Sequence, residues 1–252
     1  MNTNRDDVLA KVPEVTFGFW VTKIAATTLG ETGGDAVSMS MNLGYLVGTG
    51  IFAAIFLFAV ILQIRSQSFH PFMYWFTIIA TTTVGTTLAD FADRSLGIGY
   101  AGGTTVLMAL LVSSLWVWHK TLGSVSIASI STPKAEAFYW VTIMFSQTLG
   151  TAMGDWSADT AGLGYGGAAA VFTAMLALIV VAYYWSTLSR TVLFWAAFIL
   201  TRPLGAVVGD FLDKPVSEGG LELSRYSASA ALFIFIVIAI VLFKPRAAKA
   251  AH

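Results

Sequence analysis

Residues 17–38, FGFWVTKIAATTLGETGGDAVS, decide the fold, because they join an apolar run of bilayer length to charged residues at regular spacing. A helix needs about 20 apolar residues to cross a hydrocarbon core of roughly 30 Å. Counting back by fours from Asp35 gives Glu31, Thr27 and Lys23, which share one face of such a helix. The stretch therefore predicts a membrane helix whose polar stripe faces protein or a wet cavity.

The rest of the chain repeats this apolar character. Its 252 residues are 56% hydrophobic and 11% charged, with no cysteine and a formal net charge of zero. The expected spans are 17–38, 43–64, 72–92, 98–119, 137–158, 163–185, 191–212 and 224–243. No span alternates as an outer-membrane strand does, and helices then satisfy the backbone in lipid. We predict an all-α membrane protein with eight transmembrane helices.

Four copies of one unit make up the chain. Each copy has a tryptophan, a glycine ten residues later and an aspartate five residues after that. The three sets are Trp20, Trp75, Trp140 and Trp195; Gly30, Gly85, Gly150 and Gly205; and Asp35, Asp90, Asp155 and Asp210. Because each unit holds two spans, all copies enter the membrane in one direction, as parallel repeats. The tryptophans are expected to anchor the helices at the headgroup level.

The spacing of the copies predicts two four-helix halves. Copies 1 and 2 are offset by 55 residues, as are copies 3 and 4, whereas copies 2 and 3 are offset by 65. The predicted organisation is an N-terminal arm (1–16), a first half (17–119), a linker (120–136), a second half (137–243) and a C-terminal tail (244–252).

The distribution of basic residues predicts the orientation. Nine Lys and Arg lie in the arm, in the linkers after even-numbered spans and in the tail, whereas Arg94, Lys214 and Arg225 lie on the other side. The positive-inside bias then places the arm, the linker and the tail in the cytoplasm, with the protein in a bacterial inner membrane. The first residues lack the pattern of a cleaved signal peptide.

The tandem Trp–Gly–Asp units resemble a bacterial integral membrane protein family. That family consists of four tandem copies of a two-helix repeat of unknown function. The resemblance covers about residues 17–243. It implies the eight-helix fold and carries no assured activity.

Small residues recur four apart on the odd-numbered spans, which indicates close helix packing. Small-xxx-small faces let helix backbones approach one another in lipid. The glycines assigned to this role are Gly30, Gly34, Gly85, Gly150, Gly154, Gly205 and Gly209.

Polar stripes on the odd-numbered spans supply the candidate transport residues. The residues expected to bind or couple an ion are Lys23, Thr27, Glu31, Asp35, Asp90, Gln147, Thr151, Asp155, Arg202 and Asp210. The expected metal ligands are Glu31, Asp35, Asp155 and Asp210. Carboxylate oxygens without thiolates favour Mn²⁺, Mg²⁺ or Ca²⁺, here as substrate. The stretch ETGGD at 31–35 is also similar to the Glu-x-Gly-Asp signature of calcium and manganese exchangers.

These features favour a proton-coupled carrier of a hard divalent cation, with Mn²⁺ export first. Lys23 and Arg202 hold the carboxylates ionised in that scheme. Two alternatives stay open: an anion or organic-solute carrier that uses Lys23 and Arg202, and a non-transporting scaffold or assembly protein.

Other functions are not expected from the sequence. The three histidines are scattered and no nucleophile has a paired base, so an enzyme is not expected. The expected partners are the lipid bilayer and a small ion or solute, without nucleic acid or a certain cofactor. A homo-oligomer stays open.

Overall fold

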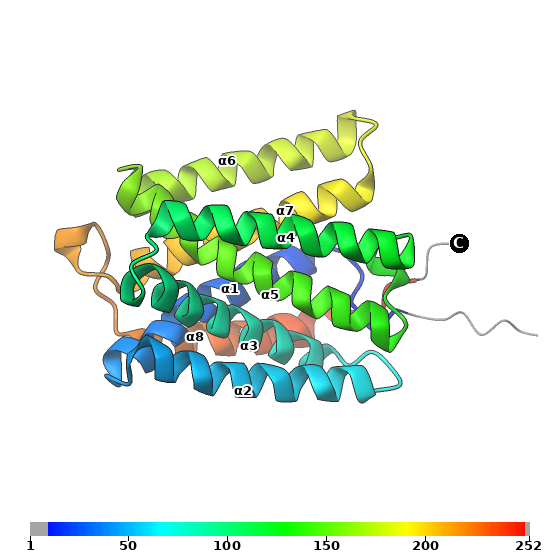
Figure 1. Cartoon of the computed structure of the whole chain (residues 1–252), viewed down its shortest axis with the longest axis horizontal. Helices are drawn as coiled ribbons and strands as arrows, with labels where there is room; N and C mark the ends of the chain where they lie inside the picture. Colours follow the sequence, from blue (N-terminus) through cyan, green and yellow to red (C-terminus); the bar gives the residue numbers. More distant parts are fainter. Residues whose placement is uncertain (1–9, 250–252) are drawn as a thin grey trace, which may run out of the picture.

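The computed structural model describes residues 10–249. Within that range the chain forms eight α-helices that run roughly parallel or antiparallel to one another (Figure 1). The helices are α1 (Phe17–Asp35), α2 (Gly44–Arg65), α3 (Pro71–Asp90), α4 (Tyr100–Leu122), α5 (Pro133–Asp155), α6 (Gly164–Trp185), α7 (Arg190–Asp213) and α8 (Arg225–Phe243).

The repeated sequence gives repeated local structure. Prolines open α3 and α5 at a position where a missing N–H costs nothing, and the Thr132 hydroxyl caps α5 by accepting from the Ala135 N–H at 3.2 Å. In the first three copies the inner helix ends at the repeated aspartate and continues as a five-residue π-helical segment. These segments are Ala36–Ser40, Phe91–Ser95 and Trp156–Thr160. The fourth copy differs, because α7 runs on to Asp213.

The odd-numbered helices form a closed inner ring. Helix α1 packs against α3 and α7, and α5 also packs against α3 and α7. Each even-numbered helix covers the inner helix of the following copy: α2 packs on α3, α4 on α5 and α6 on α7. The last helix, α8, packs on α1 and completes the same pattern (Figure 1).

Five of the described helices are long and apolar enough to cross a membrane. They are α2, α4, α6, α7 and α8. Helices α1, α3 and α5 carry polar stripes and bury most of their residues inside the bundle. The polar residues of the inner ring are therefore shielded by the apolar outer helices.

The repeated tryptophans do not anchor the inner helices at the bundle surface as predicted. Trp75, Trp140 and Trp195 are buried, and Trp20 is half-buried. They pack with neighbouring aromatic rings, and the Tyr74 and Tyr139 hydroxyl oxygens lie 2.6 Å apart. These rings meet rather than face lipid because each follows the inward-facing side of an inner helix. They form an aromatic level that closes one end of the ring.

The predicted halves contribute to the same inner ring, since α3 and α5 pack directly against each other. Their boundaries stay a prediction. Of the predicted arm and tail, residues 1–9 and 250–252 lie outside the described range.

Candidate functional site

The inner ring is organised in levels of equivalent residues. Above the aromatic level, each copy contributes one residue to each level, about one helical turn apart. The lysine level is Lys23, Ile78, Ile143 and Phe198; the arginine level is Thr27, Thr82, Gln147 and Arg202; the glutamate level is Glu31, Thr86, Thr151 and Ala206; the aspartate level is Asp35, Asp90, Asp155 and Asp210.

Glycines allow these levels to come together. A Cβ at Gly30 would lie 2.2 Å from Thr82 Oγ1, and a Cβ at Gly205 would lie 2.2 Å from Thr27 Oγ1. Gly85 and Gly150 meet Gln147 and Arg202 in the same way, and Gly34, Gly154 and Gly209 lie against Thr86, Ala206 and Glu31. Each predicted packing glycine therefore contacts the next copy around the ring.

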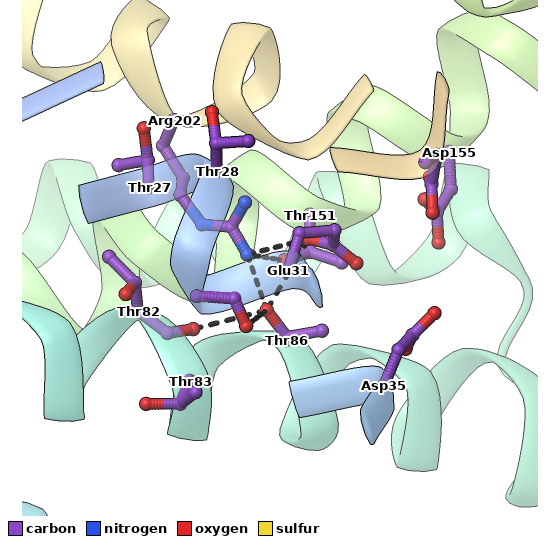
Figure 2. A network of polar contacts seen from close by, with 12 residues as sticks. Thr27, Thr28, Glu31, Asp35, Thr82, Thr83, Thr86, Thr151, Asp155 and Arg202 are labelled. Atoms are coloured by element: carbon purple, nitrogen blue, oxygen red, sulfur yellow. Dashed lines mark hydrogen bonds and ion pairs between the residues drawn. The ribbon is translucent and has the colours of Figure 1, made fainter. Parts of the chain in front are cut away.

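Glu31 and Arg202 form a fully buried ion pair between α1 and α7. The Arg202 NH2 group lies 3.0 Å from Glu31 Oε2 and donates to Thr86 Oγ1 at 2.7 Å, and it also contacts Thr151 Oγ1. The Thr86 hydroxyl donates to Glu31 Oε2 at 3.3 Å. Figure 2 shows Arg202 and Glu31 pointing toward each other beside the two threonines. All four inner helices thus contribute to one polar cluster.

Thr27, by contrast, is satisfied by backbone. Its hydroxyl lies within hydrogen-bond distance of the carbonyls of Lys23, Ile24 and Thr201, to one of which it donates. The contact with Thr201 joins α1 to α7, so Thr27 acts as a helix-packing residue in this structure.

Two cations bridge the aspartate level in pairs. Lys214 Nζ lies 2.6 Å from Asp35 Oδ2 and 3.2 Å from Asp210 Oδ1. Arg94 lies 2.9 Å from Asp90 Oδ1 and 3.3 Å from Asp155 Oδ2. Both cations follow an aspartate by four residues, in copies 2 and 4. The aspartate is repeated in all four copies, whereas the bridging cation is present only in copies 2 and 4.

These bridging cations stay charged. Burial alone lowers the pKa of Lys214, but Asp210 and Asp35 outweigh burial and raise it above its usual value. Asp90 and Asp155 outweigh burial in the same way and raise the pKa of Arg94. The four buried aspartates thus have permanent positive partners.

Three predicted metal ligands form a compact group. Glu31, Asp35 and Asp210 each offer a carboxylate oxygen, and these oxygens lie within 4.8 Å of one another. All three side chains are buried. Asp155 and Asp90 lie outside this group and form ion pairs with Arg94. We call Glu31, Asp35 and Asp210 the carboxylate triad.

A cavity of about 560 Å³ opens next to the triad. Its lining includes Lys214, Arg94, Arg225, Tyr165 and Met39. Arg225 Nε lies 3.0 Å from Asp213 Oδ2 and 3.8 Å from Asp35 Oδ2. Lys214 follows the end of α7 and lines the cavity. Its ammonium therefore lies between the triad and the cavity as a cation that is attached to the chain, and we call it the tethered cation.

Sequence reasoning missed Lys214, Arg94 and Arg225 as site residues. The distribution of basic residues predicts only that these three lie on the outer side of the membrane. The available signal was the four-residue spacing from Asp210 to Lys214 and from Asp90 to Arg94, which favours ion pairs on a helical turn.

Lys23, Gln147 and Arg202 are fully buried in the deeper part of the ring. The Lys23 ammonium lies 4.1 Å from the centre of the Phe198 ring, a cation–π contact. Arg202 uses its NH2 group for Glu31. These residues lie between the aromatic level and the triad.

Comparison with known proteins agrees with the repeated architecture. A protein-family model described as Repeat of Unknown Function (DUF347) matches residues 18–69, 73–123, 138–189 and 193–246. A search of the curated proteins and a search of the solved structures each found no significant match. The four matches start and end within a few residues of the four two-helix units. The chain therefore belongs to the Repeat of Unknown Function (DUF347) family and contains four copies of its repeat.

Proposed function

We propose that this protein is a membrane carrier for a hard divalent cation, with Mn²⁺ as the favoured substrate. The observation that carries the proposal is the carboxylate triad, whose three oxygens lie within 4.8 Å of one another inside the bundle. Carboxylate oxygens at this separation suit a divalent cation with oxygen ligands. Acids buried at such a density need a cation or protons to balance them.

Lys214 supports an exchange mechanism. Its ammonium contacts two members of the triad, Asp35 and Asp210, and therefore occupies the position of a bound cation. It lies beyond the last turn of α7 and lines the cavity of about 560 Å³. In the proposed cycle an entering cation displaces Lys214 toward this cavity. The ammonium returns when the cation leaves and replaces one of the two positive charges that the triad loses.

Protons complete the proposed cycle. Glu31 forms an ion pair with Arg202 through Oε2, and the Thr86 hydroxyl donates a hydrogen bond to the same carboxylate oxygen. A carboxylate that loses its cation in a low-dielectric interior binds a proton instead. Uptake of protons at the triad therefore compensates for release of the metal ion, as in a proton-coupled antiporter.

The proposed setting is a bacterial inner membrane. All eight helices cross the bilayer in this proposal, and the outer helices shield the polar stripes of α1, α3 and α5. The arm and the tail lie on the cytoplasmic side, where the aromatic level closes the ring. The triad and its cavity then face the outside, which suits export.

The test is Mn²⁺ flux into liposomes that contain purified protein. Asp210→Asn and Glu31→Gln each remove one triad charge and are expected to reduce flux at least about tenfold. Asp155→Asn is the matched control, because it removes an aspartate of the same level outside the triad. Equal flux in wild type and both triad variants would remove the triad from the pathway. A wild type without flux or metal-dependent stabilisation would favour a scaffold.

A further inference from the structure

The deeper part of the ring holds several buried hydrogen-bond donors, and one buried acceptor, Gln147 Oε1, without partners. Among residues 10–249, the Lys23 ammonium, both polar atoms of the Gln147 side chain and the Nε and NH1 groups of Arg202 have no hydrogen-bond partner. All three side chains are fully buried. Native proteins pair nearly all such groups, because burying an unpaired polar group is costly.

Charge is also unbalanced at this depth. The lysine and arginine levels contain two cations, Lys23 and Arg202, and the adjacent glutamate level contains one acid, Glu31. Glu31 is paired with the NH2 group of Arg202. The four aspartates one turn further on are bridged in pairs by Lys214 and Arg94. Among residues 10–249 Lys23 forms no ion pair, so its ammonium has no acidic partner in the deeper part.

The three side chains come from neighbouring helices of the inner ring. Helix α7, which carries Arg202, lies between α1, which carries Lys23, and α5, which carries Gln147. Lys23 and Arg202 belong to consecutive levels of the ring. Phe198 lies against the Lys23 ammonium, so the missing partner has to come from another side.

The surroundings favour an acceptor over a further cation. The indole N–H groups of Trp75 and Trp140, in the aromatic level next to Lys23, also lack acceptors in the described part of the chain. The residues in this stretch thus present an excess of N–H donors. A small anion satisfies several N–H donors at once and pairs with the Lys23 ammonium.

We infer that Lys23, Gln147 and Arg202 form a second ligand site, which binds a small monovalent anion between the aromatic level and the carboxylate triad. The ammonium and the guanidinium supply the charge, and the Gln147 amide donates a further hydrogen bond. The site takes a halide or the carboxylate of a small organic acid. This inference does not depend on the cation site proposed above.

The experiment measures thermal stability of purified protein in detergent at constant ionic strength. Sodium gluconate, whose anion is large, is exchanged for sodium chloride or sodium formate. We expect chloride or formate at saturation to raise the melting temperature by about 5 °C, because a ligand that binds only the native state stabilises it. A rise in melting temperature with chloride but not with formate indicates a halide site. A rise with formate but not with chloride indicates a site for a carboxylate.

Three variants separate this site from general effects of salt. Lys23→Met and Gln147→Met are expected to lose the anion-dependent shift, whereas Ile143→Met, at the lysine level of copy 3, is expected to keep it. Lys23→Met is further expected to melt above wild type in gluconate, because it removes a buried ammonium that has no hydrogen-bond or ion-pair partner. Anion stabilisation that is absent in wild type, or unchanged in Lys23→Met and Gln147→Met, overturns the inference.

A fourth variant keeps the two sites distinguishable. Asp210→Asn is expected to lose stabilisation by Mn²⁺ and to keep stabilisation by chloride or formate. Gln147→Met is expected to show the reverse. If both variants lose stabilisation by Mn²⁺ and also by the anions, the two sites are not separate. If Mn²⁺ does not stabilise the wild type, only the proposed transport of cations is contradicted.

Discussion

At the scale of single residues, the glycines at 30, 85, 150 and 205 determine how closely the inner helices approach. Each one lies against the arginine-level residue of the next copy. This arrangement places polar side chains at a helix contact where a Cβ would otherwise lie. Close packing and polar lining therefore depend on the same glycines.

Gly30→Ala tests this packing. The new Cβ would lie 2.2 Å from Thr82 Oγ1, so α1 and α3 have to move apart. We expect a loss of about 1–3 kcal/mol in the free energy of unfolding, measured by thermal or denaturant unfolding in detergent. Gly33→Ala is the control, because its nearest neighbour, Thr83 Cγ2, is 3.6 Å away. Equal stability of the two variants would contradict the packing role of Gly30.

Lys214→Met tests the tethered cation. Without the ammonium, Asp35 and Asp210 have more unbalanced negative charge, and an added cation no longer competes with Lys214. We expect the dissociation constant for Mn²⁺, measured by titration calorimetry, to fall by about tenfold. Arg94→Met removes the equivalent cation next to Asp90 and Asp155, and Mn²⁺ affinity should stay close to wild type. Weaker binding in Lys214→Met would contradict the exchange mechanism.

The carboxyl group of Asp93, just after the end of α3, makes the free energy of unfolding depend on pH. Burial raises the pKa of Asp93 to about 6, although Arg94 opposes the shift. Because this pKa lies above that of the unfolded chain, the stabilising contribution is full below about pH 4 and is lost as pH rises through about 6. Asp93→Asn should therefore exceed wild type in stability by about 1 kcal/mol at pH 7.5, after allowance for solvent screening. The difference should vanish near pH 4, and a pH-independent difference would contradict this origin.

Part of the site could be predicted from residue spacing alone. The four-residue steps correctly placed Glu31 and Asp35 on the inward face of α1, and the repeat brought Asp210 next to them. Spacing could not show that Asp155 pairs with Arg94, because that contact joins the segment after α3 to the end of α5. It also could not show that Lys214 lies between two aspartates, since that contact depends on how the chain leaves α7.

At the scale of elements, the segment before α1 and the segment after α8 fasten one end of the bundle. Ala10 N donates to Ala248 O at 3.0 Å and Ala248 N donates to Val12 O at 2.8 Å. Lys11 lies 2.5 Å from Glu136 Oε1 in α5 and donates to the carbonyl of Ser66 at 2.8 Å, after α2. One buried lysine therefore connects three parts of the fold.

Lys11→Met is expected to destabilise the protein because it leaves Glu136 as a buried charge without its ion-pair partner. Breaking a buried pair from one side costs about 3–5 kcal/mol. The double variant Lys11→Met with Glu136→Gln removes both charges and should recover most of that loss. Thermal unfolding of the single and double variants measures the coupling. Additive losses would contradict an ion pair as the cause.

The elements themselves could be predicted better than their surroundings. Apolar runs of about 20 residues were sufficient to locate eight helices, and the structure agrees with each of them to within a few residues. The environment of the tryptophans could not be read from the same runs. Whether an aromatic ring at a helix end meets lipid or another ring depends on the direction of its face in the assembled ring, which the repeat pattern leaves open.

At the scale of the whole molecule, the four copies form a closed circle. Each outer helix covers the inner helix of the next copy, and α8 covers α1. The joint between α1 and α8 includes Thr32 and Ser229, whose hydroxyl oxygens lie 2.9 Å apart. The first and last helices therefore meet as sequence neighbours do elsewhere in the circle.

A circular permutant tests this closure. A short flexible linker joins Lys249 to Ala10, and the new ends lie between Gly123 and Ser124, in the connection from α4 to α5. The paired segments at 10–13 and 247–248 bring the two ends of the described range together. We expect a melting temperature close to wild type and an unchanged response to Mn²⁺, because every helix contact is kept. An aggregated permutant would contradict the equivalence of the four joints.

The same closure determines the order in which the protein can be completed during synthesis. Of the eight described helices α1 is synthesised before the others, but α8, which covers its outer flank, is synthesised after the others. A nascent chain that stops before Arg225 has every other inner helix covered and still has an open seam at α1. Closure of the eight-helix ring therefore depends on a single docking event, that of α8, and until then the outer flank of α1 stays uncovered.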